Sequence, residues 1–92
     1  MRRLLTFDPA RAYEVDPRVA IRPEPFGALA YHYGNRRLTF LRDQLLVEVV
    51  RALAGYETAE LALAGCGVPA HRRPAFRAAL SSLAGSEVIR AR

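Results

Sequence analysis

The sequence predicts an α+β domain in which a three-stranded antiparallel sheet is followed by three helices. Two patterns support this order. Residues 18–42 form short runs rich in β-branched and aromatic side chains, separated by turn residues. Residues 43–90 instead place apolar side chains at helical spacing. The chain has 92 residues, 51% of them hydrophobic, which is enough for one domain with a modest core.

The first 17 residues are predicted to be an irregular segment. The pairs Asp8-Pro9 and Asp16-Pro17 are typical of turns and break any regular element. A single domain is therefore expected to span residues 18–92, with no internal repeat and no low-complexity tract.

Three strands are predicted between residues 18 and 42. The first, Val19 to Arg22, is expected to end at the prolines that follow it, because proline cannot donate to a strand ladder. The second runs from Phe26 to Tyr33 and alternates large and small side chains. Gly34-Asn35 predicts a hairpin turn with positive φ angles, and Arg37 to Leu41 forms the third strand. Short turns of this kind predict an antiparallel meander.

Two residues predict where helices begin. Asp43 and Thr58 are suitable N-caps, and Glu60 is favourable in the first turn after Thr58. The first helix is expected to end at Gly55 and the second near Gly65. The stripe expected to face the core in the first helix is Leu45, Leu46, Val49 and Leu53.

A third helix is predicted to begin between Pro69 and Pro74, since proline is tolerated in a first turn. It is expected to close at Gly85, after which Val88-Ile89 returns to the core as a short extended tail. Its apolar stripe is Phe76, Ala79, Leu80 and Leu83.

A cytoplasmic location is expected. Arg2 and Arg3 precede no long apolar stretch and no small-residue cleavage site, so a secretory signal is not predicted. No apolar run approaches the ~18 residues of a membrane-spanning helix. Cys66 is the single cysteine and cannot form an internal disulfide.

The residues predict no enzyme and no cofactor. His32 and His71 are the only histidines, and neither has a cysteine or carboxylate at metal-ligand spacing. Cys66 lies between two glycines and is expected to be a small buried residue at a helix end rather than a nucleophile. His32 is expected to be a half-buried strand residue. The sequence also contains no P-loop and no GxGxxG motif for a nucleotide.

A binding function is predicted instead, at the third strand. The edge strand of a small sheet offers unpaired N–H and C=O groups to which an extended peptide can add. Residues 37–41 carry apolar side chains on both faces and no proline. The alternative is that this strand pairs internally or is covered by the last helix.

The charge of the chain favours an acidic partner. All 14 basic residues are arginine, and the formal net charge is +5. Arg72, Arg73 and Arg77, near the start of the third helix, could pair bidentately with peptide carboxylates. They could equally be ordinary surface arginines, and the same alternatives hold for Arg36 and Arg37.

Three segments resemble a known family. The stretch VAIRPEPFGALAYHYGNRRLTFL from Val19 to Leu41, the run GCGVP at 65–69 and the closing IRAR at 89–92 are similar to the peptide chaperone of mycofactocin biosynthesis. The resemblance covers nearly the whole chain, and the block from Arg22 to Arg37 is its most specific part. This family belongs to the precursor-peptide recognition elements, which include the chaperone of pyrroloquinoline quinone biosynthesis.

The resemblance implies a winged-helix-like fold and a non-catalytic function. The leader of a ribosomally made precursor peptide would add as a fourth strand beside the third strand and against the third helix. The implied partner is a radical SAM enzyme that decarboxylates the C-terminal tyrosine of the precursor and cross-links it to the preceding valine. Iron–sulfur clusters and S-adenosylmethionine belong to that enzyme.

The resemblance also implies a binding groove, position by position. Its residues would be Arg37, Leu38, Thr39, Phe40, Leu41, Arg73, Phe76, Arg77 and Leu80. The strand residues match more firmly than the helix residues, because Phe76 and Leu80 could instead face the core.

A winged-helix DNA-binding protein is the alternative. The predicted topology and the positive charge permit it, and the third helix offers Arg72, Arg73, Arg77, Ser81 and Ser82 as polar side chains. Such a protein would lose affinity steeply with salt. Binding to nucleic acid is nevertheless not expected to be the function.

Overall fold

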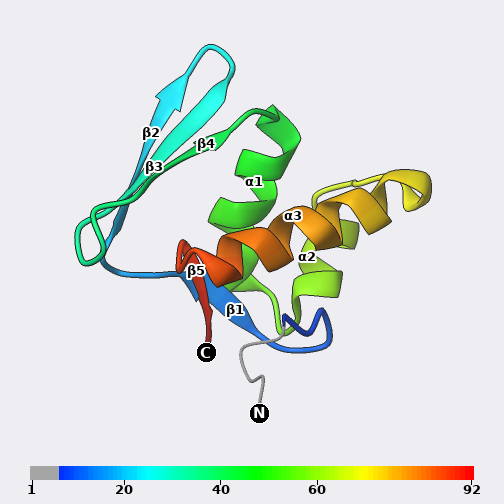
Figure 1. The fold of residues 1–92 in the computed structure, drawn as a ribbon. Coiled ribbons are helices and arrows are strands. Elements are labelled where there is room, and N and C mark those ends of the chain that lie inside the picture. The colour runs from blue at the N-terminus through cyan, green and yellow to red at the C-terminus, as the bar shows by residue number, and fades with distance from the viewer. Residues whose placement is uncertain (1–6) are drawn as a thin grey trace.

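The computed structural model describes residues 7–92, which fold into two small sheets and three helices (Figure 1). The strands are β1 (Tyr13–Val15), β2 (Val19–Glu24), β3 (Gly27–His32), β4 (Leu38–Leu41) and β5 (Ile89–Ala91). The helices are α1 (Gln44–Ala52), α2 (Ala59–Gly65) and α3 (Arg73–Gly85), with short 3₁₀ helices η1 (Leu53–Gly55) and η2 (Ala70–Arg72). Three antiparallel strands followed by three helices confirm the predicted fold class.

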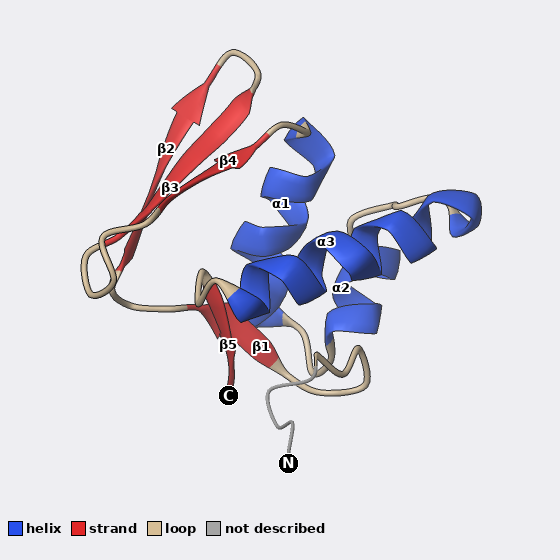
Figure 2. Cartoon of the chain, viewed as in Figure 1, coloured by secondary structure: helices blue, strands red, loops and turns tan. Residues whose placement is uncertain are grey.

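The main sheet has the order β2-β3-β4, with neighbouring strands antiparallel. Ala28, Ala30 and His32 of β3 are buried toward the helices, whereas Leu29 and Tyr31 lie on the outer face and are half-buried. Figure 2 shows this sheet on one side of the helices, and α1 contacts both β3 and β4. The sheet therefore has one face in the core and one face toward solvent.

β2 continues past the proline that was expected to end it, because Pro23 pairs with Ala28 and Glu24 with Gly27. An edge strand tolerates proline, since one side of its backbone needs no partner. Gly27 has a φ of 147°, and a Cβ built there would lie 2.0 Å from the carbonyl oxygen of Leu41. Only glycine fits at this close approach of β3 to the end of β4.

A second sheet joins the two ends of the described chain. β1 pairs with β5, so that Tyr13 lies opposite Ala91 and Val15 opposite Ile89. Tyr13 and Ile89 are 4% and 1% exposed, respectively. Residues 13–15 thus form a strand within the segment that was expected to be irregular, and the predicted extended tail is its partner.

The predicted helix starts are confirmed. Asp43 Oδ1 accepts hydrogen bonds from the N–H groups of Leu45 (2.8 Å) and Leu46 (3.4 Å). Thr58 Oγ1 accepts one from the N–H of Leu61 (3.0 Å). Pro74 lies in the first turn of α3, as expected. Each cap satisfies N–H groups that have no partner within their own helix.

The buried face of α1 matches the predicted stripe in part, because Val49 and, in the adjoining η1, Leu53 are buried. Val47, Val49 and Val50 are buried, while Leu45 and Leu46 are only half-buried. The reason is that α1 packs against β1 and α2 as well as the sheet, so a second face of the helix is covered. In α3 the prediction holds for the large side chains, because Phe76, Leu80 and Leu83 are buried.

Candidate peptide-binding site

β4 is an edge strand whose outer side is open. It pairs with β3 from Tyr31↔Leu38 to Ala28↔Leu41, and no strand within residues 7–92 pairs with its other side. A strand edge of this kind leaves backbone N–H and C=O groups that an extended peptide can satisfy. In the described part of the chain, the edge that the sequence singled out has no strand on its outer side, and its use by a guest peptide stays a prediction.

The side chains of β4 alternate between the two faces of the sheet. Leu38 and Phe40 are 52% and 49% exposed on the outer face, whereas Leu41 is 1% exposed in the core. The Phe40 ring stacks on Phe26 at 5.8 Å, and the Arg42 guanidinium lies 5.0 Å from its centroid. A guest strand beside β4 would place alternate side chains next to this exposed apolar pair.

Two of the predicted groove residues of α3, Phe76 and Leu80, point inward. Phe76 and Leu80 are 4% and 0% exposed and belong to the core cluster. Of the two alternatives that the sequence left open for them, the structure shows them packed in the core. They anchor α3 in the core, and a direct role in peptide contact stays a prediction.

The arginines at the start of α3 are engaged within the chain. Arg77 donates two hydrogen bonds of 2.8 Å to the two carboxylate oxygens of Glu60. This bidentate pair lowers the pKa of Glu60 against the effect of burial, and it raises the pKa of Arg77. Arg73 Nε donates to the carbonyl oxygen of Val68 (3.0 Å). These two side chains are thus less free to meet a peptide than the sequence suggested.

Arg72 connects η2 to the turn that follows β4. Its Nη2 lies 2.7 Å from Asp43 Oδ2, and both side chains are partly exposed, at 44% and 36%. Oδ1 of Asp43 caps α1, while its Oδ2 binds Arg72. This carboxylate therefore links the residues that follow β4 to Arg72, which directly precedes α3. Burial raises the pKa of Asp43, but the hydrogen bonds from Arg72 and the α1 amides outweigh it and lower the pKa. The sequence indicated the cap but not this ion pair.

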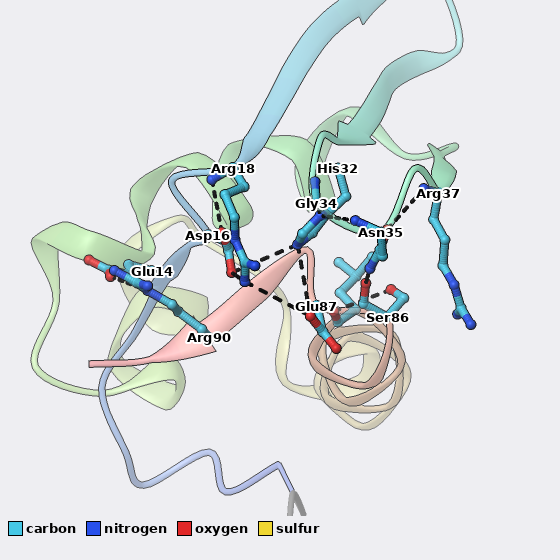
Figure 3. Close-up of polar contacts among 11 residues, drawn as sticks. Glu14, Asp16, Arg18, His32, Gly34, Asn35, Arg37, Ser86, Glu87 and Arg90 are labelled. Carbon is cyan, nitrogen blue, oxygen red and sulfur yellow. Dashed lines mark hydrogen bonds and ion pairs between the residues drawn. The ribbon is translucent and has the colours of Figure 1, made fainter.

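A buried polar cluster lies at the opposite end of β4 (Figure 3). His32 is 1% exposed, more deeply buried than predicted, and its ring faces Asp16 and Glu87. Arg18 binds Asp16 through two side-chain hydrogen bonds of 3.1 and 3.0 Å. These bonds lower the pKa of Asp16 from 3.8 to about 2, although burial opposes the shift. Sequence reasoning gave no sign of this cluster.

Two further observations concern metal ligands and thiol chemistry in the described residues. No three His, Cys, Asp or Glu side chains between residues 7 and 92 are grouped to hold a metal ion. Cys66 caps the end of α2 and is half-buried, and burial raises the pKa of its thiol, so little reactive thiolate forms. None of the helices in this part of the chain is long and apolar enough to span a membrane.

The sequence is similar to known peptide chaperones. Residues 12–90 match the Peptide chaperone MftB family. The chain is 46% identical over 83 residues to a protein named Peptide chaperone MftB in Mycobacterium tuberculosis, and 43% identical over 83 residues to one in Mycobacterium ulcerans. It is 42% identical over 85 residues to one in Mycolicibacterium smegmatis. The alignments cover 90–92% of this chain and 76–83% of the relatives. No solved structure matches the chain significantly.

Proposed function

The chain belongs to the Peptide chaperone MftB family, and from this membership we propose that it binds the leader of the mycofactocin precursor peptide along the open edge of β4. A chaperone of this family is a binding protein and not an enzyme. The observation that carries the proposal is the unpaired side of β4, at residues 38–41. A cytoplasmic location for this complex stays a prediction.

Main-chain hydrogen bonds to β4 alone do not give the guest peptide high affinity. Each hydrogen bond between a guest strand and β4 contributes only about 1 kcal/mol net, because water is displaced from both partners. Burial of apolar area at about 25 cal/mol/Å² must add to this. Leu38 and Phe40, both about half exposed, are the apolar side chains of β4 that can lose such area.

The positively charged side chains near β4 would favour guest peptides that carry acidic residues. The Arg72–Asp43 pair is exposed, so it contributes only about 0–1 kcal/mol and can be exchanged at little cost. An acidic side chain of the leader can therefore take the place of Asp43 as the partner of Arg72, while Asp43 keeps its bonds to the α1 amides. Arg37 and Arg42 add exposed positive charge at the two ends of β4.

The chaperone would then present the bound precursor to a radical SAM maturation enzyme. Holding the leader and the enzyme in one complex makes the later encounter intramolecular and raises the local precursor concentration to about millimolar. The iron–sulfur clusters, S-adenosylmethionine and redox chemistry belong to that enzyme. This chain contributes the binding and the orientation of the leader.

Strand addition predicts a specific response to N-methylation of the leader. In a set of peptides methylated at one backbone nitrogen each, alternate positions along the bound segment should lose affinity, since only every second N–H of a strand faces its neighbour. The affinity of each peptide is measured by titration with and without the enzyme. Absence of binding by the unmodified leader in both conditions, or losses with no alternation, would contradict the proposal.

DNA binding is the alternative function, and two of the basic side chains it would use are engaged within the chain. Arg77 is paired with Glu60, and Arg73 Nε donates to the carbonyl oxygen of Val68. A gel shift with random duplex DNA across a salt series tests this alternative directly.

A further inference from the structure

His32 accepts two hydrogen bonds that fix the turn before β4. Its Nδ1 accepts from the backbone N–H of Gly34 (2.9 Å) and of Asn35 (3.0 Å). A nitrogen that accepts must carry a lone pair, so the neutral ring holds its proton on Nε2. Gly34 packs so closely on the ring that an added Cβ would lie 2.7 Å from Cε1 of His32. The His32 ring and the backbone of the turn are therefore in close contact.

The other ring nitrogen faces charged groups. Within the described residues Nε2 has no hydrogen-bond partner, and it lies 3.9 Å from Asp16 Oδ2 and 3.9 Å from Glu87 Oε1. Arg18 binds Asp16 and lies 4.0 Å from Glu87. Figure 3 shows these side chains converging on the ring from the β1–β2 turn and the α3–β5 turn. Two carboxylates and one guanidinium group therefore lie around the ring.

The two turns that meet at His32 are both strained. Arg36 (φ 65°) and Glu87 (φ 67°) are the only residues other than glycine with positive φ among those that the structure describes. Each such residue costs about 1 kcal/mol and persists only where its surroundings hold it. Asn35 joins the turns, because its Nδ2 donates to the carbonyl oxygen of Ser86 (3.4 Å) and its Oδ1 accepts from the N–H of Arg37.

We propose that His32 is a positioning residue for the β4 edge and that protonation of its ring weakens leader binding. A second proton can enter only at Nδ1, where it converts the acceptor of two hydrogen bonds into a donor. The N–H groups of Gly34 and Asn35 then lose their partner, and the turn at 33–37 keeps the backbone bonds that join His32 to Arg36 and Arg37. β4 begins directly after this turn, at Leu38, so the start of its edge is held less firmly for a guest strand. The inference rests on the proposed function, because its main readout is leader affinity.

The test compares leader affinity at about pH 7.5 and at a lower pH, chosen below the midpoint at which an NMR titration shows the His32 ring gaining its second proton. The unmodified chain should bind about tenfold more weakly at the lower pH, the loss expected from one to two net hydrogen bonds. His32→Asn should bind normally and without this pH dependence, because an Asn side chain can accept from the same turn and does not titrate. His32→Leu should bind weakly at both values. The matched control is His71→Asn, which removes the other, exposed histidine and should keep the pH dependence.

Equal pH dependence of His32→Asn and the unmodified chain would overturn the inference. An NMR titration of the unmodified free protein keeps the test independent of any variant that fails to fold. The amide signals of Gly34 and Asn35 should shift with the same midpoint as the His32 ring, and amides that stay unchanged while the ring titrates would also overturn it. Failure of the leader to bind at about pH 7.5 would instead contradict the proposed function, and the amide titration would still decide whether protonation breaks the two hydrogen bonds to His32.

Discussion

Two regions of this chaperone that contain edge strands differ in what they bury. β4, the open strand, exposes Leu38 and Phe40, whereas β1 and β5, the closed pair, bury Tyr13 and Ile89, although within residues 7–92 all three strands are paired on one side only. The closed pair holds the ends of the described chain in the core. The open strand contributes Leu41 to the core and leaves a backbone edge free. From this difference we expect stability and the proposed peptide binding to depend on separate strands, so that mutations should affect one without the other.

The largest expected effect is on the closed pair. Ile89→Ala removes a side chain that is 1% exposed and should lower the free energy of unfolding by about 2–5 kcal/mol, because a cavity remains in the core. Denaturant unfolding monitored by circular dichroism measures this loss. The folded fraction should still bind the leader with unchanged affinity; a parallel loss of affinity would break the proposed separation.

The next effect is on the open strand. Phe40→Asp should weaken leader binding about 10- to 100-fold, because a charge replaces apolar area that the guest strand covers. Its free energy of unfolding should fall by only about 1–2 kcal/mol, since Phe40 is 49% exposed and the loss comes from its stacking on Phe26 and its strand propensity. Leu61→Asp on α2 is the matched control, because Leu61 is 50% exposed and lies outside the proposed site. Unchanged affinity in folded Phe40→Asp protein would rule out this placement of the guest.

A third prediction concerns acid stability. The pKa of Asp16 is lowered from 3.8 to about 2 in the folded state, so the stabilisation it provides is complete above about pH 4 and is lost as the pH falls toward 2. Asp16→Asn should lower the free energy of unfolding at neutral pH by about 1 kcal/mol and make the acid-induced decrease shallower. Unfolding curves at several pH values measure both changes. An equally steep decrease in the variant would show that other carboxylates dominate.

The smallest effect is expected at Arg72. Arg72→Ala removes an exposed ion pair and should change the free energy of unfolding by less than about 1 kcal/mol. It should weaken an acidic leader more than a peptide whose acidic residues are replaced by amides. Arg77→Ala is the comparison, because Arg77 is held by Glu60 and should not distinguish the two peptides. Equal losses for both peptides with Arg72→Ala would argue against Arg72 as the group that selects for charge.

Local signals in the sequence were sufficient for most of the fold. Asp43 and Thr58 cap helices because the groups they bond lie two or three residues away. The open strand was also identified from its own residues. In contrast, β1 depends on β5, which lies at the far end of the chain, and the local Asp-Pro pair suggested only a turn. A sequence pattern within a few residues of β1 cannot indicate that this strand pairs with β5, at the other end of the chain.

Side-chain partners were harder to predict than elements. The arginines of α3 suited an incoming carboxylate, but Glu60 and Asp43 already occupy two of them through contacts that span 17 and 29 positions. The sequence predicts positive φ angles at Gly34 and Asn35 in the turn before β4. In the structure, the residue of this turn with a positive φ is Arg36. The reason lies in His32, whose buried ring fixes the N–H groups of Gly34 and Asn35 and shifts the strain to the following residue.

The central claim is that a guest strand pairs with the free side of β4. Amide hydrogen exchange with and without the leader peptide tests it most directly. Residues 38–41 should gain protection in the complex, with alternate amides most affected, while β1 and β5 stay unchanged. If the β4 amides exchange as fast in the presence of the leader as in the free protein, and protection appears elsewhere instead, the account is contradicted.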